Sequence, residues 1–147
     1  MKVLFLDIDG VMNSVRGKGP FISDMEEEKL LRLAALIREG GARGIVLTSD
    51  RRTSPFDLRS KTEALAQFGI KLLGVTRDPL EDEDDSRGRQ ILDYLESSEE
   101  DIERIVILDD NDDGISPLFY EDFVLINRYY GLREEDKARA LNRLNGA

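Results

Sequence analysis

Five short apolar runs, separated by segments with helical spacing, constrain the fold of this chain more than any other feature. Near-continuous apolar runs of five or six residues are typical of strands that are buried on both faces of a sheet. The runs are KVLFLD (2–7), GIVLTS (44–49), IKLLGV (70–75), RIVILD (104–109) and FVLIN (123–127). The sequence therefore predicts five strands, and the first of them ends at two closely spaced aspartates.

Between these runs, apolar residues recur at the spacing of amphipathic helices. The predicted helices are 24–39, 57–68, 86–96 and 133–144. For the first helix we expect Ser23 or Asp24 as the N-cap and Gly40-Gly41 as the end. Strands that alternate with helices predict a parallel sheet with right-handed crossovers. We therefore expect one α/β domain over 1–147, a three-layer Rossmann-like fold with a five-stranded, mainly parallel sheet and helices on both faces.

The residue types that are missing narrow the chemistry. The chain has 147 residues and contains neither cysteine nor histidine. This excludes disulfides, thiolate nucleophiles, histidine-based triads, and metal sites built from Cys or His. Catalysis would have to use carboxylates, hydroxyls, Lys, Arg, backbone amides or a hard metal ion.

The net charge of −10 disfavours non-specific binding to a polyanion, because phosphate backbones attract dense Lys and Arg. A local basic groove is still compatible with this total. No apolar run approaches the roughly 20 residues needed to cross a bilayer, and acidic residues follow the first strand where a signal peptide would continue. We therefore expect a cytoplasmic protein without a membrane partner.

Polar clusters directly follow three of the predicted strands: D-I-D-G, T-S-D-R and D-D-N-D-D. In an open α/β sheet, ligands bind beyond the carboxyl ends of the strands. Asp7 and Asp9 can project to the same side of an extended segment, and Gly10 permits a sharp turn. Together with Asp109 and Asp110 they would place four carboxylates near one point. A hard cation relieves such repulsion, and an all-oxygen site that keeps some waters suits Mg²⁺.

Each of these clusters alone has a simpler explanation. D-x-D-G can be a turn or a helix cap, Thr-Ser after a strand can start a helix, and D-D-N-D-D-G can be a polar turn that lacks the spacing of a calcium loop. The run EDEDD (81–85) is expected to be a solvated loop. The occurrence of three polar clusters, each after a strand, is what indicates a site.

With these motifs in this order, the chain resembles the haloacid dehalogenase-like (HAD-like) phosphohydrolases over essentially its whole length. FLDIDGV is similar to their first motif, hhhDxDG[TV], and VILDDNDD to their acidic fourth motif. The resemblance implies that Asp7 is the nucleophile, that Asp9 is the general acid and base, and that both belong to a Mg²⁺ site completed by Asp109 and Asp110. In family members, the second aspartate of the first motif ligates the ion through its backbone carbonyl rather than its side chain.

The other two motifs of the family concern the phosphoryl group. LTSDR is similar to the second motif, whose Thr or Ser hydrogen-bonds the phosphoryl group, so this residue is Thr48 or Ser49. The third motif supplies a Lys or Arg at the start of the helix before the fourth strand. Arg87, in SRGRQILDYL, stands at that position, and Arg89 is the near alternative.

Within the superfamily, the chain looks like the phosphatase domains of polynucleotide repair enzymes, in particular those of multifunctional RNA-repair proteins. S-D-R at 49–51 is similar to the S-G-R of polynucleotide 3′-phosphatases, which favours Ser49 over Thr48 and adds Arg51 as a substrate-binding residue. The R-G-x-x-I-L-x-Y-L segment and a Gly-Leu after the fifth strand extend the resemblance. Asp50 in place of a small residue, and Arg rather than the commoner Lys in the third motif, depart from it and leave room for weak activity.

The gaps between the motifs are too short for a cap domain of the usual size. Asp9 to Ser49 spans about 40 residues, most of them used by the first helix, and Ser49 to Arg87 holds one helix and one strand. An uncapped site is open, so it admits a large substrate such as a nucleic-acid end or a protein. Basic residues after the first two motifs form either a local basic rim or scattered solubilising charges. They are Arg16, Lys18, Arg51, Arg52, Arg59 and Lys61.

The sequence thus predicts a Mg²⁺-dependent phosphatase that acts through an aspartyl-phosphate on phosphorylated RNA or DNA ends, with 3′-phosphate preferred. Two alternatives remain open. One is a small-molecule phosphatase for nucleotides or sugar phosphates, whose site is closed by another subunit. The other is a HAD-like binding module whose catalysis has decayed. Intact Asp7 and Asp9 argue against decay, whereas Asp50 and the arginine of the third motif argue for it.

Overall fold

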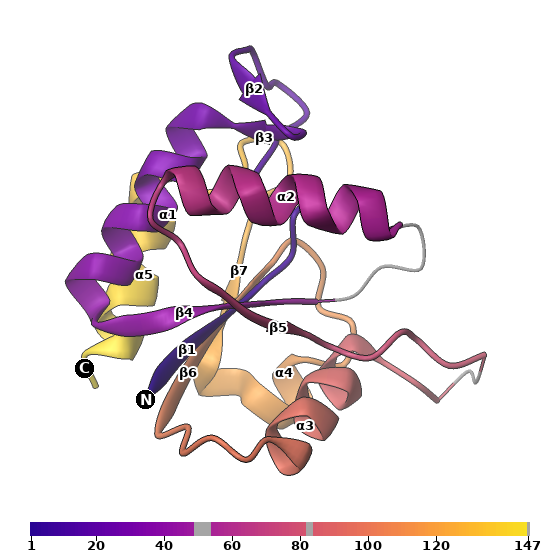
Figure 1. Cartoon of the computed structure of the whole chain (residues 1–147). Coiled ribbons are helices and arrows are strands. Elements are labelled where there is room, and N and C mark those ends of the chain that lie inside the picture. Colours follow the sequence, from indigo (N-terminus) through magenta and orange to yellow (C-terminus); the bar gives the residue numbers. More distant parts are fainter. Residues whose placement is uncertain (49–53, 82–83, 147) are drawn as a thin grey trace.

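A five-stranded, fully parallel sheet forms the centre of the protein (Figure 1), whose computed structural model describes residues 1–48, 54–81 and 84–146. Every pairing between neighbouring strands is parallel, and their order is β5-β4-β1-β6-β7. The strands are β1 (Lys2–Leu6), β4 (Ala42–Leu47), β5 (Leu72–Val75), β6 (Arg104–Asp109) and β7 (Phe123–Leu125). The chain builds the sheet outward from β1 to β5, then returns to the other side of β1 with β6. The order therefore reverses between β1 and β6, and such a reversal point is where open α/β sheets bind ligands.

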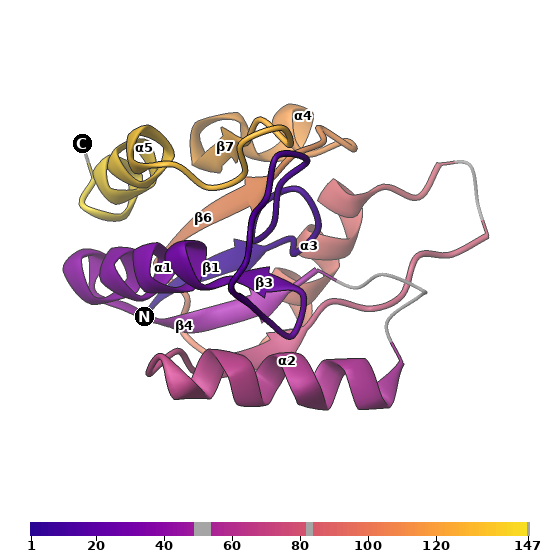
Figure 2. The ribbon, with the colours of Figure 1, turned by 90° about the horizontal axis from the view of Figure 1, so that it is seen from above.

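Helices cover both faces of this sheet, which confirms the predicted three-layer α/β fold (Figures 1 and 2). One face packs against α1 (Glu27–Gly40), α2 (Pro55–Gln67) and α5 (Glu134–Leu144). The other packs against α3 (Arg87–Ser97) and the short α4 (Ser116–Phe119), which continues into the 3-10 turn η1 (Tyr120–Asp122). Strands with two covered faces need apolar residues at every position, and β1 shows this because its side chains alternate between the two cores.

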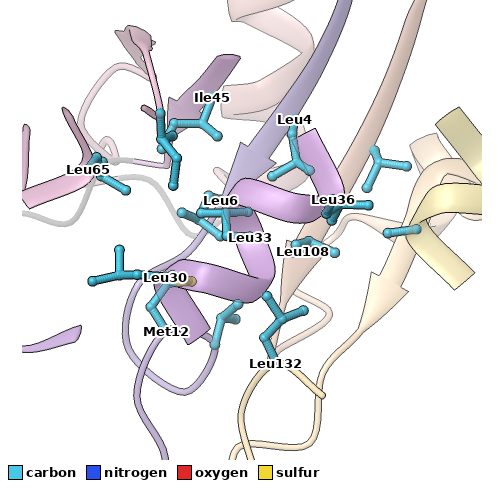
Figure 3. Close-up of a cluster of buried hydrophobic side chains, with 14 of the residues drawn as sticks. Leu4, Leu6, Met12, Leu30, Leu33, Leu36, Ile45, Leu65, Leu108 and Leu132 are labelled. Atoms are coloured by element: carbon cyan, nitrogen blue, oxygen red, sulfur yellow. The ribbon is translucent and has the colours of Figure 1, made fainter. Parts of the chain in front are cut away.

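The larger core lies between the sheet and α1 (Figure 3). Leu30, Leu33 and Leu36 recur along one side of α1 and are fully buried among side chains from the strands. Leu4 and Leu6 of β1 belong to the same core. Burial of each leucine contributes about 1.5–3 kcal/mol, and truncation of one to alanine would cost about 2–5 kcal/mol because a cavity remains.

The predicted N-cap of α1 is wrong. Ser23 and Asp24 have positive φ angles of 50° and 63° and form the turn of a small antiparallel hairpin, β2 (Phe21–Ile22) and β3 (Met25–Glu26). Asn13 fixes this turn, since its Nδ2 donates to the Asp24 carbonyl at 2.9 Å. Helix α1 begins only after the hairpin, at Glu27. At the other end, Gly41 takes the left-handed C-cap conformation, in agreement with the predicted end.

No cap domain is present within the described residues. The hairpin β2–β3 is the only element between β1 and α1, and α2 and β5 are the elements between β4 and α3. None of the described helices combines the length and apolar character required to span a bilayer. The edge of the sheet where β1 and β6 end is therefore not covered by a second folded unit.

Candidate active site

Three carboxylates meet at the reversal point of the sheet. Asp7 follows β1, Asp109 is the last residue of β6, and Asp110 follows it. Because β1 and β6 are parallel neighbours, their carboxyl ends reach the same edge. One carboxylate oxygen from each of the three aspartates lies within 4.8 Å of the others. The structure thus brings together three of the four carboxylates that the sequence placed near one point.

Burial changes the ionisation of these carboxyl groups. It raises the pKa of Asp7 to about 9, and the charge of Asp109 adds to this shift while Arg87 opposes it. Burial also raises the pKa of Asp109, whose side chain has no exposed surface. Like charges that are held close together and away from water cannot all ionise without a compensating cation. The cluster therefore has the electrostatic character of a cation site.

Arg87 is the one arginine that reaches into this cluster from α3. Its Nη1 donates to Asp109 Oδ2 at 2.8 Å and lies 3.3 Å from Asp7 Oδ1. Burial acts to lower the pKa of Arg87, but Asp109 and Asp7 outweigh it and raise that pKa. Arg89 is exposed, and its backbone N–H bonds to the Ser86 side chain at the start of the helix. Of the two arginines that the third motif left open, the structure places Arg87 at the carboxylates.

Asp9 lies beside this cluster but outside it. Its side chain is exposed, it is not one of the three grouped carboxylates, and Asn13 Nδ2 lies 3.2 Å from its Oδ1. Gly10, which follows Asp9, has a φ of +84°, and a Cβ at this position would lie 2.7 Å from Asp110 Cγ. Glycine is therefore required both for the turn and for the close approach of the two loops. A side chain at position 10 would displace Asp110.

The acidic run after β6 divides between two tasks. Asp109 and Asp110 belong to the carboxylate cluster. Asp112 instead accepts the N–H groups of Ile115 and Ser116 at the start of α4, and Asp113 Oδ2 accepts the N–H of Arg87 at 3.1 Å. The run is thus both a site and a polar turn, and the turn is what holds the first residue of α3 against β6.

A pocket of about 400 Å³ opens next to Asp7. Thr48 lines it together with Asp7 and Asp9, and the Thr48 hydroxyl lies 3.3 Å from the carbonyl of Leu6. Thr48 is thereby fixed to the end of β1. The other predicted phosphoryl-binding residues, Ser49 and Arg51, lie outside the described residues, as do Asp50 and Arg52.

Two basic side chains line this pocket, and the sequence analysis predicted only one of them. Lys61 of α2 lines it, in keeping with a rim position, whereas the nearby Arg59 is exposed. Arg77, after β5, also lines the pocket and was missed. Its only sequence signal is its position just beyond a strand end, which carried no recognisable motif.

Arg77 also overturns part of the interpretation of EDEDD as a solvated loop. It donates two hydrogen bonds to Asp85, at 2.7 and 3.0 Å, and the Asp85 side chain is only 2% exposed. Glu81 and Asp84 are exposed, as expected; 82–83 lie outside the described residues. The loop folds back because Asp85 finds an arginine partner after the neighbouring strand.

The comparison with known families agrees with this geometry. Residues 3–137 match the family described as the HAD domain in Swiss Army Knife RNA repair proteins. The chain belongs to this family. The matched segment contains every motif discussed above, which confirms the resemblance to HAD-like domains of RNA-repair proteins. No curated protein and no solved structure matches the chain significantly.

Proposed function

We propose that this HAD domain is a Mg²⁺-dependent phosphatase that acts through an aspartyl-phosphate and takes phosphorylated nucleic-acid ends, with 3′-phosphate preferred. The observation that carries the proposal is the group of Asp7, Asp109 and Asp110 around Arg87, at the reversal point of the sheet. This group lies in a domain whose family takes its name from RNA repair. Because the chain has neither histidine nor cysteine, the side-chain metal ligands and the nucleophile of this site are carboxylate oxygens.

The residues present fit a hard cation. Asp7, Asp109 and Asp110 supply carboxylate oxygens within 4.8 Å of one another, which is the donor type that Mg²⁺ prefers. We assign these three side chains to the ion and, following the family pattern, the Asp9 backbone carbonyl. When bound, Mg²⁺ would offset the charge that carboxylate and phosphate bring together.

The covalent step would use Asp7, which lines the open pocket. A carboxylate oxygen of Asp7 forms a bond to phosphorus as the bond from phosphorus to the leaving oxygen breaks. Asp9, exposed beside it, gives its proton to that leaving oxygen. Water then attacks the aspartyl-phosphate while Asp9 takes a proton back, which releases phosphate and restores Asp7.

The positive and polar groups nearby would hold the phosphoryl oxygens. Arg87 compensates negative charge at Asp7 and Asp109 in the protein itself, and Thr48 stands fixed at the pocket wall. We also assign Ser49 and Arg51 to phosphoryl binding, on the strength of the second motif. Preorganised donors of this kind supply most of the rate in phosphoryl transfer.

The pocket suits the terminal nucleoside of a strand. Its volume of about 400 Å³ is within the range of small-ligand sites. Apolar residues such as Leu58 and Val75 line it beside Lys61 and Arg77, so it offers a base both apolar contact and cationic neighbours. The absence of a cap domain among the described elements leaves room for the rest of the strand.

The test compares kcat/KM for a 3′-phosphorylated oligonucleotide, a 5′-phosphorylated oligonucleotide and a mononucleotide phosphate, at low and moderate salt. We expect the 3′-phosphorylated strand to be preferred, and this preference to weaken as salt rises because counterions are released on binding. Asp7→Asn, prepared in parallel, identifies any contaminating phosphatase. Equal or faster turnover of the mononucleotide, without salt dependence, would replace this proposal by the small-molecule phosphatase.

A further inference from the structure

Two loops beyond the carboxyl ends of β1 and β7 lie side by side (Figure 2), and backbone hydrogen bonds join them into one surface. The N–H of Val15 donates to the carbonyl of Arg128 at 3.1 Å, and the N–H of Leu132 donates to that of Val11 at 2.8 Å. Gly131 lies where the loops meet, with a φ of +70°, and a Cβ there would lie 3.0 Å from the Val11 carbonyl oxygen. The backbone positions from which the side chains of this surface project are therefore fixed.

Two exposed tyrosines and two arginines form its outer layer, which we name the tyrosine platform (Arg16, Arg128, Tyr129 and Tyr130). Tyr129 is 49% exposed and Tyr130 37%, and their rings meet edge to face at 4.9 Å. The guanidinium of Arg16 lies 5.5 Å from the centroid of Tyr130, and that of Arg133 lies 5.0 Å from the same ring. Aromatic rings are thus presented to solvent with cations beside them.

Charge near the platform is opposite to the charge of the whole protein. A pocket of about 350 Å³ next to Tyr130 is lined by five cations and only three carboxylates, although the chain carries −10. The cations are Arg16, Lys18, Lys29, Arg32 and Arg133, and the carboxylates are Glu26, Glu28 and Glu134. Lys29, Arg32 and Arg133 are ion-paired with carboxylates, so the unpaired positive charge is that of Arg16 and Lys18, neither of which forms a salt bridge with a residue in the described ranges.

The platform is continuous with the candidate active site. Arg128 Nε lies 3.4 Å from Asp110 Oδ2, although the Arg128 side chain is 75% exposed. Tyr129 and Tyr130 follow it directly in the chain. A strand whose end lies at the carboxylate cluster would therefore meet these rings within its next nucleotides.

We propose that the tyrosine platform binds the single-stranded segment of nucleic acid adjacent to the phosphorylated end, which rests on the function proposed above. Exposed aromatic rings bind unpaired bases by stacking, without sequence preference, and neighbouring arginines bind the phosphates. An acidic protein that binds nucleic acid needs one local surface of positive charge, and the two arginine-bearing loops provide it. The occupant is thus a flexible, unpaired strand.

The experiment measures binding of a fluorescein-labelled, single-stranded RNA ten-mer with a 3′-hydroxyl, by anisotropy and without turnover. We expect Tyr129→Ala to weaken binding about tenfold, because loss of stacking on one base is of that size. Tyr129→Trp should retain binding, since it keeps the stacking surface. Tyr120→Ala is the matched control: Tyr120 is 79% exposed but lies just before β7, at the opposite end of the sheet, and its loss should change nothing.

The charge contribution has its own control. Arg16→Gln should reduce the salt dependence of binding, whereas Arg43→Gln, an exposed arginine near the amino end of β4, should not. In turnover, Tyr129→Ala should lower the ratio of kcat/KM for a 3′-phosphorylated ten-mer to that for p-nitrophenyl phosphate by about the same factor.

The possible outcomes distinguish a failure of the platform proposal from a failure of the phosphatase proposal. If the wild type does not bind the ten-mer, or if Tyr129→Ala and Arg16→Gln bind it as the wild type does, the platform proposal is overturned, whatever the phosphatase activity. If Tyr129→Ala weakens binding but no nucleic-acid phosphate is hydrolysed, the platform is upheld as a strand-binding surface and the phosphatase proposal fails.

Discussion

The clusters around Arg77 and Arg87 contain the same two residue types, yet their carboxyl groups respond to the fold in opposite ways. Arg77 donates to Asp85 through two nitrogens and to Asp93 through Nε at 2.8 Å. Asp85 also accepts the Leu80 N–H at 2.8 Å and Gln90 Nε2 at 3.2 Å. These hydrogen bonds, those from Arg77 foremost, hold the pKa of Asp85 well below its usual range.

The cluster around Arg87 has fewer such donors within the described residues. Asp109 accepts from Arg87 Nη1 at 2.8 Å and from the Asn111 N–H at 3.0 Å, and the same arginine nitrogen lies 3.3 Å from Asp7. Burial consequently dominates and raises the pKa of Asp7 to about 9. Asp110 brings a third carboxylate, whose salt bridge within the described ranges is to the largely exposed Arg128.

The difference shows that an arginine alone does not keep the pKa of an aspartate low: burial and neighbouring carboxylates raise the pKa of Asp7, whereas hydrogen bonds outweigh burial at Asp85. The Arg77 cluster is complete and attaches the loop after β5 to α3. Among the described residues, the Arg87 cluster has three carboxylates and two arginines, and we propose that a metal ion and a substrate use this excess of negative charge. A pair of matched substitutions, Asp7→Asn and Asp85→Asn, separates the two roles.

The largest expected effect is on turnover. Asp7→Asn should lower kcat by at least about a thousandfold, because an amide is a poor nucleophile and nothing else in the cluster can replace it. Asp85→Asn should keep kcat within about tenfold of the wild type, because it alters a loop anchor rather than a reacting atom. Both are measured under saturating substrate. Near-normal turnover by Asp7→Asn would remove the covalent mechanism.

Metal removal should come next in size. Excess chelator should abolish activity, and Ca²⁺ should restore it poorly because its larger, looser coordination misplaces the nucleophile. In thermal unfolding, Mg²⁺ at a hundred times its dissociation constant should stabilise the wild type by about 2.7 kcal/mol. Asp110→Asn should lose most of this stabilisation, and Asp85→Asn should keep it. Full activity in chelator, or equal Mg²⁺ responses in the two variants, would contradict the assigned ligands.

Stability should show the reverse order of effects. Asp85→Asn should lower the free energy of unfolding by about 1–3 kcal/mol, because the donors of Arg77 and Leu80 lose their charged acceptor. Asp7→Asn should cost less in metal-free buffer, where it removes a carboxyl group that burial disfavours in its charged form. Urea unfolding of both variants measures this. A larger loss for Asp7→Asn would mean that the Arg87 cluster holds the fold together.

The two clusters should also differ in the pH dependence of stability in metal-free buffer. The folded-state pKa of Asp7 is raised from 3.8 to about 9, so the folded chain holds a proton that the unfolded chain releases. Its contribution to stability is full below pH 3.8 and is lost as pH rises toward 9. The pKa of Asp85 is lowered from 3.8, so its contribution to stability is present above pH 3.8 and is lost in acid.

The free energy of unfolding, measured across this pH range, should therefore no longer fall toward alkaline pH in Asp7→Asn, and it should fall less toward acid pH in Asp85→Asn. The slope for either group is at most about 1.4 kcal/mol per pH unit. Unchanged profiles in both variants would show that neither carboxyl group is shifted in the way that its surroundings indicate.

Local pattern in the sequence was sufficient for the main strands and helices, although it missed the β2–β3 hairpin and α4. The five strands, the helices between them and the parallel sheet follow from apolar spacing. A strand that is buried on both faces needs apolar residues at nearly every position, and this shows in the sequence as a continuous apolar run. Asp7, Asp109 and Asp110 could be placed at one edge for the same reason, since parallel neighbours end together. Gly10 could be recognised because the turn after the first motif needs a backbone that other residues avoid.

Only the tertiary structure decided which side chains meet across large distances in the chain. Arg87 rather than Arg89 faces the carboxylates because successive helical residues point in different directions, and the phase is set by how α3 packs on the sheet. Asp85 is part of an acidic run that looks solvated, and its burial depends on Arg77, which follows β5. The tyrosine platform joins segments more than 100 residues apart. Local spacing encodes the elements, whereas contacts between elements exist only once they have packed.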